Sequence, residues 1–266
     1  MGTGLSSCLC SEAMLLSEDF QQWADRLRER KGHVHRKVWE RCFICQALME
    51  HGQLTPGKRG LGFAVGEESL ASLFATYGVN IVATDIHTEV ATSQGWVSSE
   101  QHAGGLEALN KRGICDEAQL RRLVQFKFAD MNHIGAEFDR GFDFVWSSCA
   151  FEHLGTLEHG KQFVLNAMRC LKPGGVAVHT TEFNLSSNDA TIDSGNTVLY
   201  RRQDIEALIY ELLGLGHRIT MDWQLGAGIA DSFVDLPPYQ NDMQLRLRFG
   251  DYNVTSLGII VEKGRE

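Results

Sequence analysis

The dipeptide Glu152-His153, in the stretch CAFEHLG, has the residue types needed for acid–base chemistry. A histidine can take a proton from a hydroxyl or a phenol near neutral pH, and a neighbouring carboxylate can support it. The pair follows the apolar run Phe142–Ser147, which has the composition of a buried strand. We therefore expect His153 to lie at a strand end and to act as a base, with a purely structural Glu-His pair as the alternative.

Two acids end other apolar runs nearer the N-terminus. Asp85 closes the run Asn80–Thr84, and Asp130 follows Gln125–Ala129. The carboxyl ends of parallel strands meet at one edge of a sheet, where one acid can accept both hydroxyls of a ribose and another can hold an adenine amino group. The two positions together indicate a site for an adenosine-containing cofactor.

The glycines in GLGFAVGEE resemble a dinucleotide fingerprint, but that motif must follow a strand. The preceding LTPGKR is polar and broken by Pro56, so Gly60–Ala64 must itself be the strand. The following loop then contains Gly66, Glu67 and Glu68, and its two acids oppose a pyrophosphate. A cofactor with an amino group and a sulfonium suits this loop better, although the acids can instead complement a helix dipole.

Further polar candidates lie closer to the C-terminus. His179 has apolar neighbours, which favours a place in the core. Glu182 follows it and is expected to reach the cleft and contact the substrate. Arg201, just before a helical pattern, is suited to hold a carboxylate, a phosphate or a sugar hydroxyl, with a solvated helix start as the alternative. The last candidates belong to an irregular segment and are Asp231, Asp235 and Tyr239.

Strand-like and helix-like patterns alternate from residue 60 onward. This alternation predicts an α/β fold with a doubly wound, mostly parallel sheet. The expected strands are Gly60–Ala64, Asn80–Thr84, Gln125–Ala129, Phe142–Ser147, Gly175–Thr181, His217–Asp222 and Thr255–Val261. The expected helices are Ser69–Tyr77, Ser99–Arg112, Leu157–Leu171 and Arg202–Leu213.

Two segments lie outside this alternation. Residues 1–57 are expected to form an N-terminal helical cap or lid, with two helices between residues 12 and 52 and a break near Lys31-Gly32. Residues 58–266 form the expected cofactor-binding domain. Within that domain, residues 223–254 are long, irregular and rich in aromatic and apolar side chains, which predicts an insertion on the substrate side.

Composition narrows the class of protein. The net charge of −9 gives no general attraction to nucleic acid, and no apolar run reaches the length needed to cross a membrane. The count of seven cysteines is odd, and most lie in apolar segments, so we expect reduced, buried thiols and a cytoplasmic protein. Cys42 and Cys45 share one face of a helical pattern, which favours core packing over a zinc site.

These motifs together resemble the class I S-adenosylmethionine-dependent methyltransferases, over residues 58–262. The segment around Gly66 matches the first motif of that family with only its middle glycine kept, and Gly62 stands where the family often has an acid. Closer matches are FDFVWSSCAFEHLG, for the fourth strand, and LKPGGVAVHTTEFN, for the turn and fifth strand. The resemblance implies a seven-stranded Rossmann-like sheet whose last strand is antiparallel.

The resemblance also implies roles for individual residues. The catalytic residues would be His153 and Glu152, and the substrate would contact Glu182, Arg201 and Tyr239. S-adenosylmethionine would be held by Ala64, Gly66, Glu68, Asp85, Ile86, Asp130, Met131 and Ser147. The expected reaction is O-methylation of a small molecule, most plausibly a sugar or another polyhydroxy metabolite.

A second, narrower likeness is to terminal 2′-O-methyltransferases of small RNAs, which hold a divalent metal through Glu and His. Here Cys149 replaces the first glutamate, and no histidine lies between Glu182 and Arg201, so the ligand set is incomplete and we expect no metal and no nucleic acid partner. The remaining alternatives are a nicotinamide-dependent oxidoreductase and a non-catalytic scaffold that binds S-adenosylmethionine.

Overall fold

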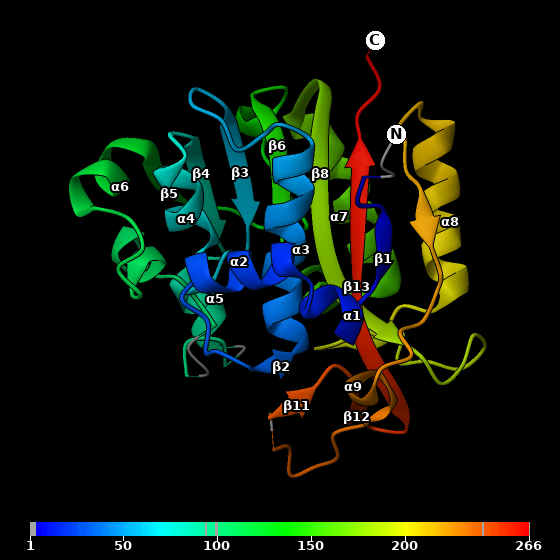
Figure 1. Cartoon of the computed structure of the whole chain (residues 1–266). Coiled ribbons are helices and arrows are strands. Elements are labelled where there is room, and N and C mark those ends of the chain that lie inside the picture. The colour runs from blue at the N-terminus through cyan, green and yellow to red at the C-terminus, as the bar shows by residue number, and fades with distance from the viewer. Residues whose placement is uncertain (1–3, 94, 99–100, 241, 266) are drawn as a thin grey trace.

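The computed structural model describes residues 4–265 except 94, 99, 100 and 241. Its main sheet runs in the order β10-β1-β13-β8-β6-β3-β4-β5, and β12 pairs with β13, which makes nine strands in the described part of the chain (Figure 1). Strands β5, β4, β3, β6 and β8 are mutually parallel, whereas β13 is antiparallel to β8. The bounds are β1 Ser7–Leu9, β3 Arg59–Phe63, β4 Asn80–Asp85, β5 Val124–Phe128, β6 Phe142–Ser147, β8 Leu171–Asn184, β10 Met221–Asp222, β12 Leu247–Phe249 and β13 Tyr252–Glu262.

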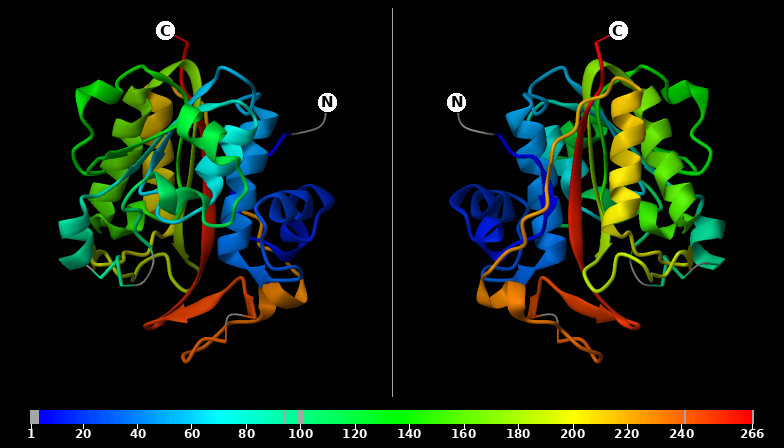
Figure 2. Two further views of the ribbon diagram at one scale, coloured as in Figure 1. Left: turned by 90° about the vertical axis from the view of Figure 1, so that its left-hand side faces the viewer. Right: turned by 90° about the vertical axis from the view of Figure 1, so that its right-hand side faces the viewer.

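Helices cover both faces of this sheet, so it lies between two helical layers (Figure 2). Successive strand residues point to opposite faces, and in β8 Val176 and Val178 enter one core while Ala177 enters the other. The first core also takes side chains from α2, α3, α4 and α6, and the second takes them from α7 and α8. The helices are α1 Glu12–Leu15, α2 Glu18–Arg26, α3 Arg36–Glu50, α4 Leu70–Thr76, α5 Thr88–Ser93, α6 Glu117–Leu123, α7 Leu157–Cys170, α8 Arg202–Gly214 and α9 Ile229–Ser232.

The predicted alternation is confirmed, with differences at several elements. All seven expected strands are present, but His217–Asp222 shrinks to the two residues of β10, and the fifth strand extends to Asn184. The helix expected over Ser99–Arg112 is wrong, because in its described part the chain forms only the short 3-10 helix η1, Leu106–Asn110. Two further 3-10 turns, η2 Ala136–Phe138 and η3 Phe151–His153, flank β6.

The N-terminal segment does more than form a helical cap. Its residues Ser7–Leu9 form β1, a strand that the sequence did not predict, which lies between β13 and β10. Helix α3 then packs on the sheet, where the Phe43 ring lies so close to Gly258 that an added Cβ would approach it to 2.4 Å. The helix is therefore anchored on one face of the sheet (Figure 1).

The insertion is joined to the N-terminal segment. Its strand β11, Met243–Gln244, pairs with β2, Val34–His35, immediately before α3. The backbone N–H of Glu12 also donates to the Asp231 carboxylate at 2.9 Å. A smaller pair, β7 Gly155–Thr156 with β9 Ser194–Gly195, links the start of α7 to the segment after β8.

The glycines of GLG serve the packing of the sheet. Gly60 and Gly62 lie beside Phe144 and Trp146 of β6, and an added Cβ would come within 2.3 Å of either ring. The side chain that the family often has at position 62 is therefore sterically excluded by Trp146.

Because of this contact, we expect Gly62→Ala to destabilise the fold by about 1–3 kcal/mol, the usual cost of overpacking a core. At roughly 2–4 °C per kcal/mol for a domain of this size, thermal unfolding should detect the change. Gly214→Ala is the matched control, since nothing lies within 4 Å of its added Cβ, and it should leave the melting temperature unchanged or slightly raised. An unchanged melting temperature for Gly62→Ala would contradict the packing account.

Candidate active site

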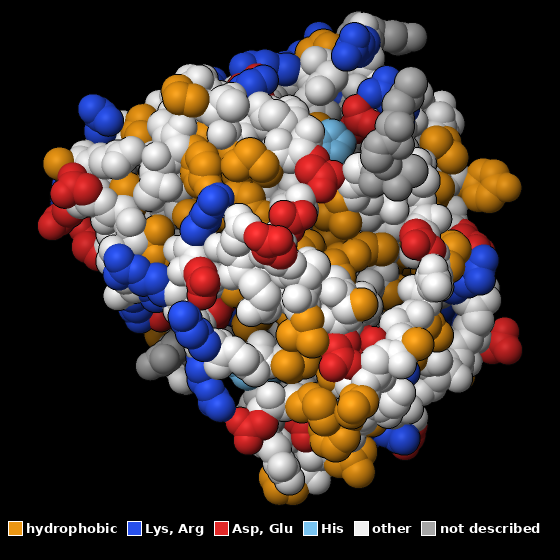
Figure 3. Space-filling model, in the orientation of Figure 1, with side chains coloured by type: hydrophobic (Ala, Val, Ile, Leu, Met, Phe, Trp, Pro, Cys, Tyr) orange, Lys and Arg blue, Asp and Glu red, His pale blue; other side chains and the backbone are white. Residues whose placement is uncertain are grey.

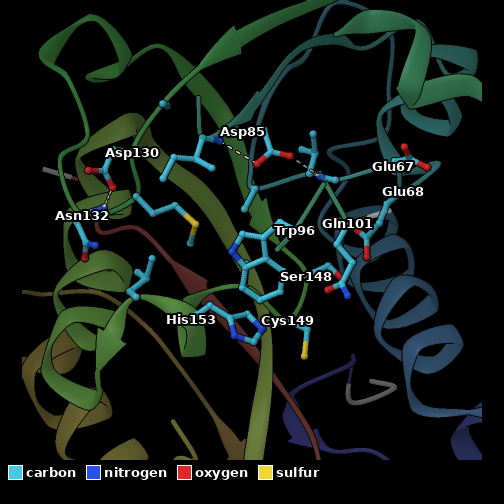
Figure 4. A pocket seen from close by; sticks show the side chains of 18 of the residues that line it. Glu67, Glu68, Asp85, Trp96, Gln101, Asp130, Asn132, Ser148, Cys149 and His153 are labelled. Carbon is cyan, nitrogen blue, oxygen red and sulfur yellow. Dashed lines mark hydrogen bonds between the residues drawn. The ribbon is translucent and has the colours of Figure 1, made fainter. Parts of the chain in front are cut away.

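A cavity of about 490 Å³ opens at the carboxyl edge of β3, β4, β5 and β6. Its walls come from the loop after β3, from the residues that follow the other three strands, and from helix α3. In Figure 4, Asp130 and Asn132 lie on one side, Glu68 and Gln101 on the other, with Trp96 between them and His153 and Cys149 at one end. The residues predicted at separate strand ends are thus brought into one cavity.

The loop after β3 has the backbone that its sequence requires. Ala64 and Gly66 both have positive φ, 46° and 50°. A Cβ at position 66 would approach the Gln101 carbonyl oxygen to 2.7 Å, so only glycine fits there. Positive φ at the non-glycine Ala64 is strained, as is common at functional sites.

The two acids of this loop have different surroundings. Glu67 forms an ion pair with Lys111, whereas Glu68 is turned toward Ser148 and the cavity (Figure 4). Within the described chain, no side chain caps the first turn of α4. Glu68 lies two residues before the first residue of α4, Leu70.

Asp85 is buried, and its carboxylate organises the loops around it. Oδ2 accepts the backbone N–H groups of Gly66, at 3.1 Å, and Ala103, at 3.0 Å, while Oδ1 accepts that of Ile86 at 2.8 Å. Burial raises the pKa of Asp85, and these N–H donors oppose the rise. A carboxylate has about four acceptor sites, so Oδ1 keeps capacity for a ribose hydroxyl.

The residues around Asp130 can form the other end of a nucleoside site. Ile86, Asp130 and Met131 line the cavity, and Met131 is buried. The Asp130 carboxylate accepts the Asn132 backbone N–H at 2.8 Å, which fixes the turn after β5. Ser147, which was also predicted to contact the cofactor, is not among the described residues that line the cavity. Its hydroxyl lies 2.8 Å from His179 Nδ1 instead.

His153 is held in one tautomer at the wall of the cavity. Its Nδ1 lies 2.8 Å from the Asn196 carbonyl oxygen, which can only accept, so Nδ1 carries the proton and Nε2 has the free lone pair. The ring stands against Trp96 with centroids 4.7 Å apart (Figure 4). Nε2 lies 4.0 Å from Glu152 Oε1.

Glu152 belongs to a buried cluster behind this wall. Its Oε1 accepts from Cys149 Sγ at 2.6 Å, and its Oε2 accepts the Thr181 hydroxyl at 3.1 Å. Burial raises the pKa of Glu152 overall, and the nearby Lys37 ammonium, or a protonated His153, opposes the rise. Burial likewise raises the pKa of Cys149 well above its usual value, so this thiol stays protonated although it reaches the cavity.

Glu182 lies in the same cluster and is paired with cations. Its Oε1 is 2.7 Å from Arg36 Nη1 and 3.9 Å from Lys37 Nζ, both of which belong to α3. Cys149, Glu152 and Glu182 place possible metal ligands within 4.8 Å of one another. Since Arg36 and Lys37 already provide two positive charges there, the arrangement does not fit an added metal cation.

Three other predicted residues lie away from the cavity. His179 is fully buried, and burial lowers its pKa to about 3, in agreement with the predicted place in the core. Arg201 pairs with Asp204 at 2.8 Å at the start of α8, and the Tyr239 hydroxyl donates to the Arg248 carbonyl at 2.6 Å. Neither of these two, nor Glu182, is among the described residues that line the cavity.

The lining residues that were absent from the sequence-based set include Lys37, Arg41, Trp96 and Gln101. Lys37 and Arg41 are four residues apart on α3, so the basic face of an otherwise apolar helical pattern was the available signal. Trp96 and Gln101 lie on irregular chain, where no local pattern marks a contact with the cavity.

Comparison with known proteins agrees with this geometry. Residues 61–179 match a family model described as a methyltransferase domain, and no curated protein sequence matches the chain. The [4+2]-cyclase SpnF superposes with a TM-score of 0.53 at 14% identity, covering 99% of this chain and 100% of that one. A phosphoethanolamine N-methyltransferase 2 of Haemonchus contortus, solved with S-adenosyl-L-methionine, gives 0.50 at 15% identity and covers 94% of this chain and 61% of that one.

Residues 61–179 thus match a methyltransferase domain, and the fold is that of the class I, Rossmann-like S-adenosylmethionine-dependent methyltransferases. The chain is a transferase that takes its methyl group from S-adenosylmethionine. The residues present fit this cofactor, because Glu68 Oε2 and Ser148 Oγ are buried polar atoms at the cavity that make no hydrogen bond of ordinary geometry in the described chain. Among the described helices none is long and apolar enough to span a bilayer.

Proposed function

We propose that the enzyme transfers the methyl group to an oxygen of a small polyhydroxy acceptor such as a sugar. The observation that carries this proposal is the tautomer of His153, whose Nδ1 proton is committed to the Asn196 carbonyl at 2.8 Å. The free Nε2 is then a base at the cavity wall. A hydroxyl acceptor needs such a base, because it must lose its proton as the new bond forms.

The proposed roles follow from these contacts. Bound S-adenosylmethionine supplies a methyl group activated by its sulfonium. His153 Nε2 removes the acceptor proton, and the Glu152 carboxylate, 4.0 Å away, stabilises the imidazolium that results. Cys149 and Thr181 each hydrogen bond to one oxygen of Glu152, which favours its ionised form and fixes its position.

The surroundings of His153 support a small acceptor. The Trp96 ring offers a flat apolar surface, and Lys37 and Cys149 add polar atoms to the same cavity. Basic and acidic side chains are interspersed on the face shown in Figure 3, and the net charge is −9. Neither feature supports a nucleic acid substrate.

A metal-assisted transfer to the 2′-hydroxyl of a terminal nucleotide is the second candidate, favoured by the close approach of Cys149, Glu152 and Glu182. The pairing of Glu182 with Arg36 at 2.7 Å argues against it. A chelator distinguishes the two candidates.

The test is transfer of labelled methyl from S-adenosylmethionine to matched panels of polyols and sugars, phenols, amines and short RNA. We expect product in the first panel, with equal rates in the presence and absence of EDTA. Transfer confined to amines would overturn the acceptor assignment. Transfer to RNA that EDTA abolishes and manganese restores would establish the second candidate instead.

We further propose that the enzyme works in the cytoplasm. All seven cysteines are free, and six of them are buried. Unpaired thiols of this kind suit a reducing compartment.

A further inference from the structure

Two cavity residues of opposite charge, Arg41 and Glu68, form a loose pair at the end of the cavity next to the loop after β3. Arg41 Nη1 lies 3.9 Å from Glu68 Oε1, which is longer than a hydrogen bond. Arg41 comes from α3 and Glu68 from the loop, and both line the cavity. The space between them is therefore bounded by one cationic and one anionic group.

Arg41 keeps its charge and its position. Its Nε lies 2.8 Å from Glu29 Oε1, and Arg112 approaches the same oxygen at 2.7 Å. Burial lowers the pKa of Arg41, but Glu29 and Glu68 outweigh this effect, so the pKa is raised overall. Arg41 and Arg112 thus share the single carboxylate of Glu29. This carboxylate neutralises only one of the two guanidinium groups.

Glu68 is an anionic group that lacks a close cationic partner. Its Oε2 is buried and makes no hydrogen bond of ordinary geometry in the described chain, although the Ser148 hydroxyl is close enough to lower the pKa of Glu68. Burial raises the pKa of Glu68 to about 7, although the charge of Arg41 opposes the rise. A buried carboxylate with an unused oxygen is costly unless a donor or a cation meets it.

We propose that Arg41 and Glu68 hold the amino-acid end of S-adenosylmethionine, with Arg41 on its carboxylate and Glu68 on its ammonium group. A free α-amino acid carries a carboxylate and an ammonium group close together. These two charges complement the guanidinium of Arg41 and the carboxylate of Glu68. Position 62 has no room for an acid beside Trp146, so Glu68 supplies that charge from the loop. The inference rests on the use of this cofactor and is independent of which acceptor is methylated.

Lys37 is the competing partner for the carboxylate, since it also lines the cavity from α3. Its Nζ, however, is already paired with Glu40 at 3.3 Å and approaches Glu182 at 3.9 Å. It also lies near Cys149, which is at the same end of the cavity as His153 (Figure 4). Arg41 is therefore the better match, and the Lys37→Met variant tests the choice.

The experiment is calorimetry with four ligands: S-adenosylhomocysteine, its analogues without the carboxylate or without the amino group, and 5′-methylthioadenosine, which lacks the whole amino-acid end. In the native protein each truncated analogue should bind roughly 10- to 100-fold more weakly than S-adenosylhomocysteine, the range expected for losing a contact between charged groups. Arg41→Met should weaken S-adenosylhomocysteine by a similar factor and leave the decarboxylated analogue unchanged. Glu68→Gln should likewise weaken the binding of S-adenosylhomocysteine and leave the affinity for the analogue without the amino group unchanged.

Controls separate this inference from folding and from the cofactor assignment. Glu67→Gln and Lys37→Met should keep the native order of affinities, and unchanged binding of 5′-methylthioadenosine reports an intact nucleoside site in every variant. Equal affinities of the native protein for all four ligands would overturn the pairing, and that measurement needs no variant. If no adenosine ligand binds the native protein, the cofactor assignment itself is wrong.

Discussion

His153→Ala is expected to lower kcat by about 10²- to 10⁴-fold, the contribution of a positioned general base. The reason is the geometry at the cavity wall, where the Asn196 carbonyl fixes the proton on Nδ1 and leaves Nε2 as the acceptor. Affinity for S-adenosylhomocysteine should change little, since the residues assigned to the cofactor lie elsewhere in the cavity. Initial rates with the identified acceptor, together with calorimetry, measure the two effects separately.

The control for this substitution is His159→Ala. His159 lies six residues further on, with its Nδ1 2.9 Å from the Leu154 carbonyl, and it is not among the described residues of the cavity wall. Its removal should leave kcat within a few-fold of the native value. Added imidazole should partly restore the kcat of the His153→Ala variant, because a free base can enter the vacated space.

A structural Glu-His pair behaves differently from a base. If His153 only supports the loop after β6, the alanine variant loses thermal stability, and imidazole restores no activity. Glu152→Gln refines the test, since it keeps the shape of the side chain and removes its charge. A smaller loss of kcat than in His153→Ala, with unchanged affinity for the acceptor, fits a carboxylate that acts through His153.

Fold likeness alone does not decide between catalysis and other uses of this architecture. The solved structure with a TM-score of 0.53 is named as a [4+2]-cyclase, although it has the same fold. Function must therefore be argued from the site. The acceptor is the part of the chemistry to be identified, and His153, Trp96 and Lys37 are the lining residues to which we assign it.

The sequence predicted the strand-end residues well because two local rules act together. Apolar runs mark buried strands, and a parallel sheet places all their carboxyl ends at one edge. Asp85, Asp130 and His153 follow such runs, and all three line the cavity. The same rules fixed the register of the loop at Gly66, whose backbone conformation the structure confirms.

The sequence could not reveal contacts that depend on distant segments. The position of α3 depends on packing such as that of Phe43 against Gly258, more than two hundred residues away. The basic face of the α3 pattern was visible in the sequence, but the cavity that Arg41 and Lys37 reach was not. Strand β1 has three residues and is defined by its pairing with β13 and β10. Glu182 was expected in the cleft, but Arg36 from the same helix binds it from behind the cavity wall.

Asp85→Ala is expected to weaken the binding of S-adenosylhomocysteine by at least about 100-fold. The variant removes the acceptor for a ribose hydroxyl, and a hydrogen bond to a charged group contributes about 1.5–3 kcal/mol. It also removes the common acceptor of the Gly66, Ile86 and Ala103 backbone N–H groups, so the loops on both sides of the cavity lose their link. The two effects act in the same direction, and calorimetry measures their sum.

Thermal unfolding of the same variant separates binding from stability. Buried N–H groups left without an acceptor cost about 1–3 kcal/mol, so the melting temperature should fall even without ligand. Asp116→Ala is the matched control, because it removes the carboxylate that caps α6 through the Ala118 and Gln119 N–H groups, at a cost of about 1 kcal/mol. That variant should lose stability but bind S-adenosylhomocysteine as the native protein does. Equal affinity of the native protein and Asp85→Ala would mean that this carboxylate only organises the loops and that the ribose is held by other groups.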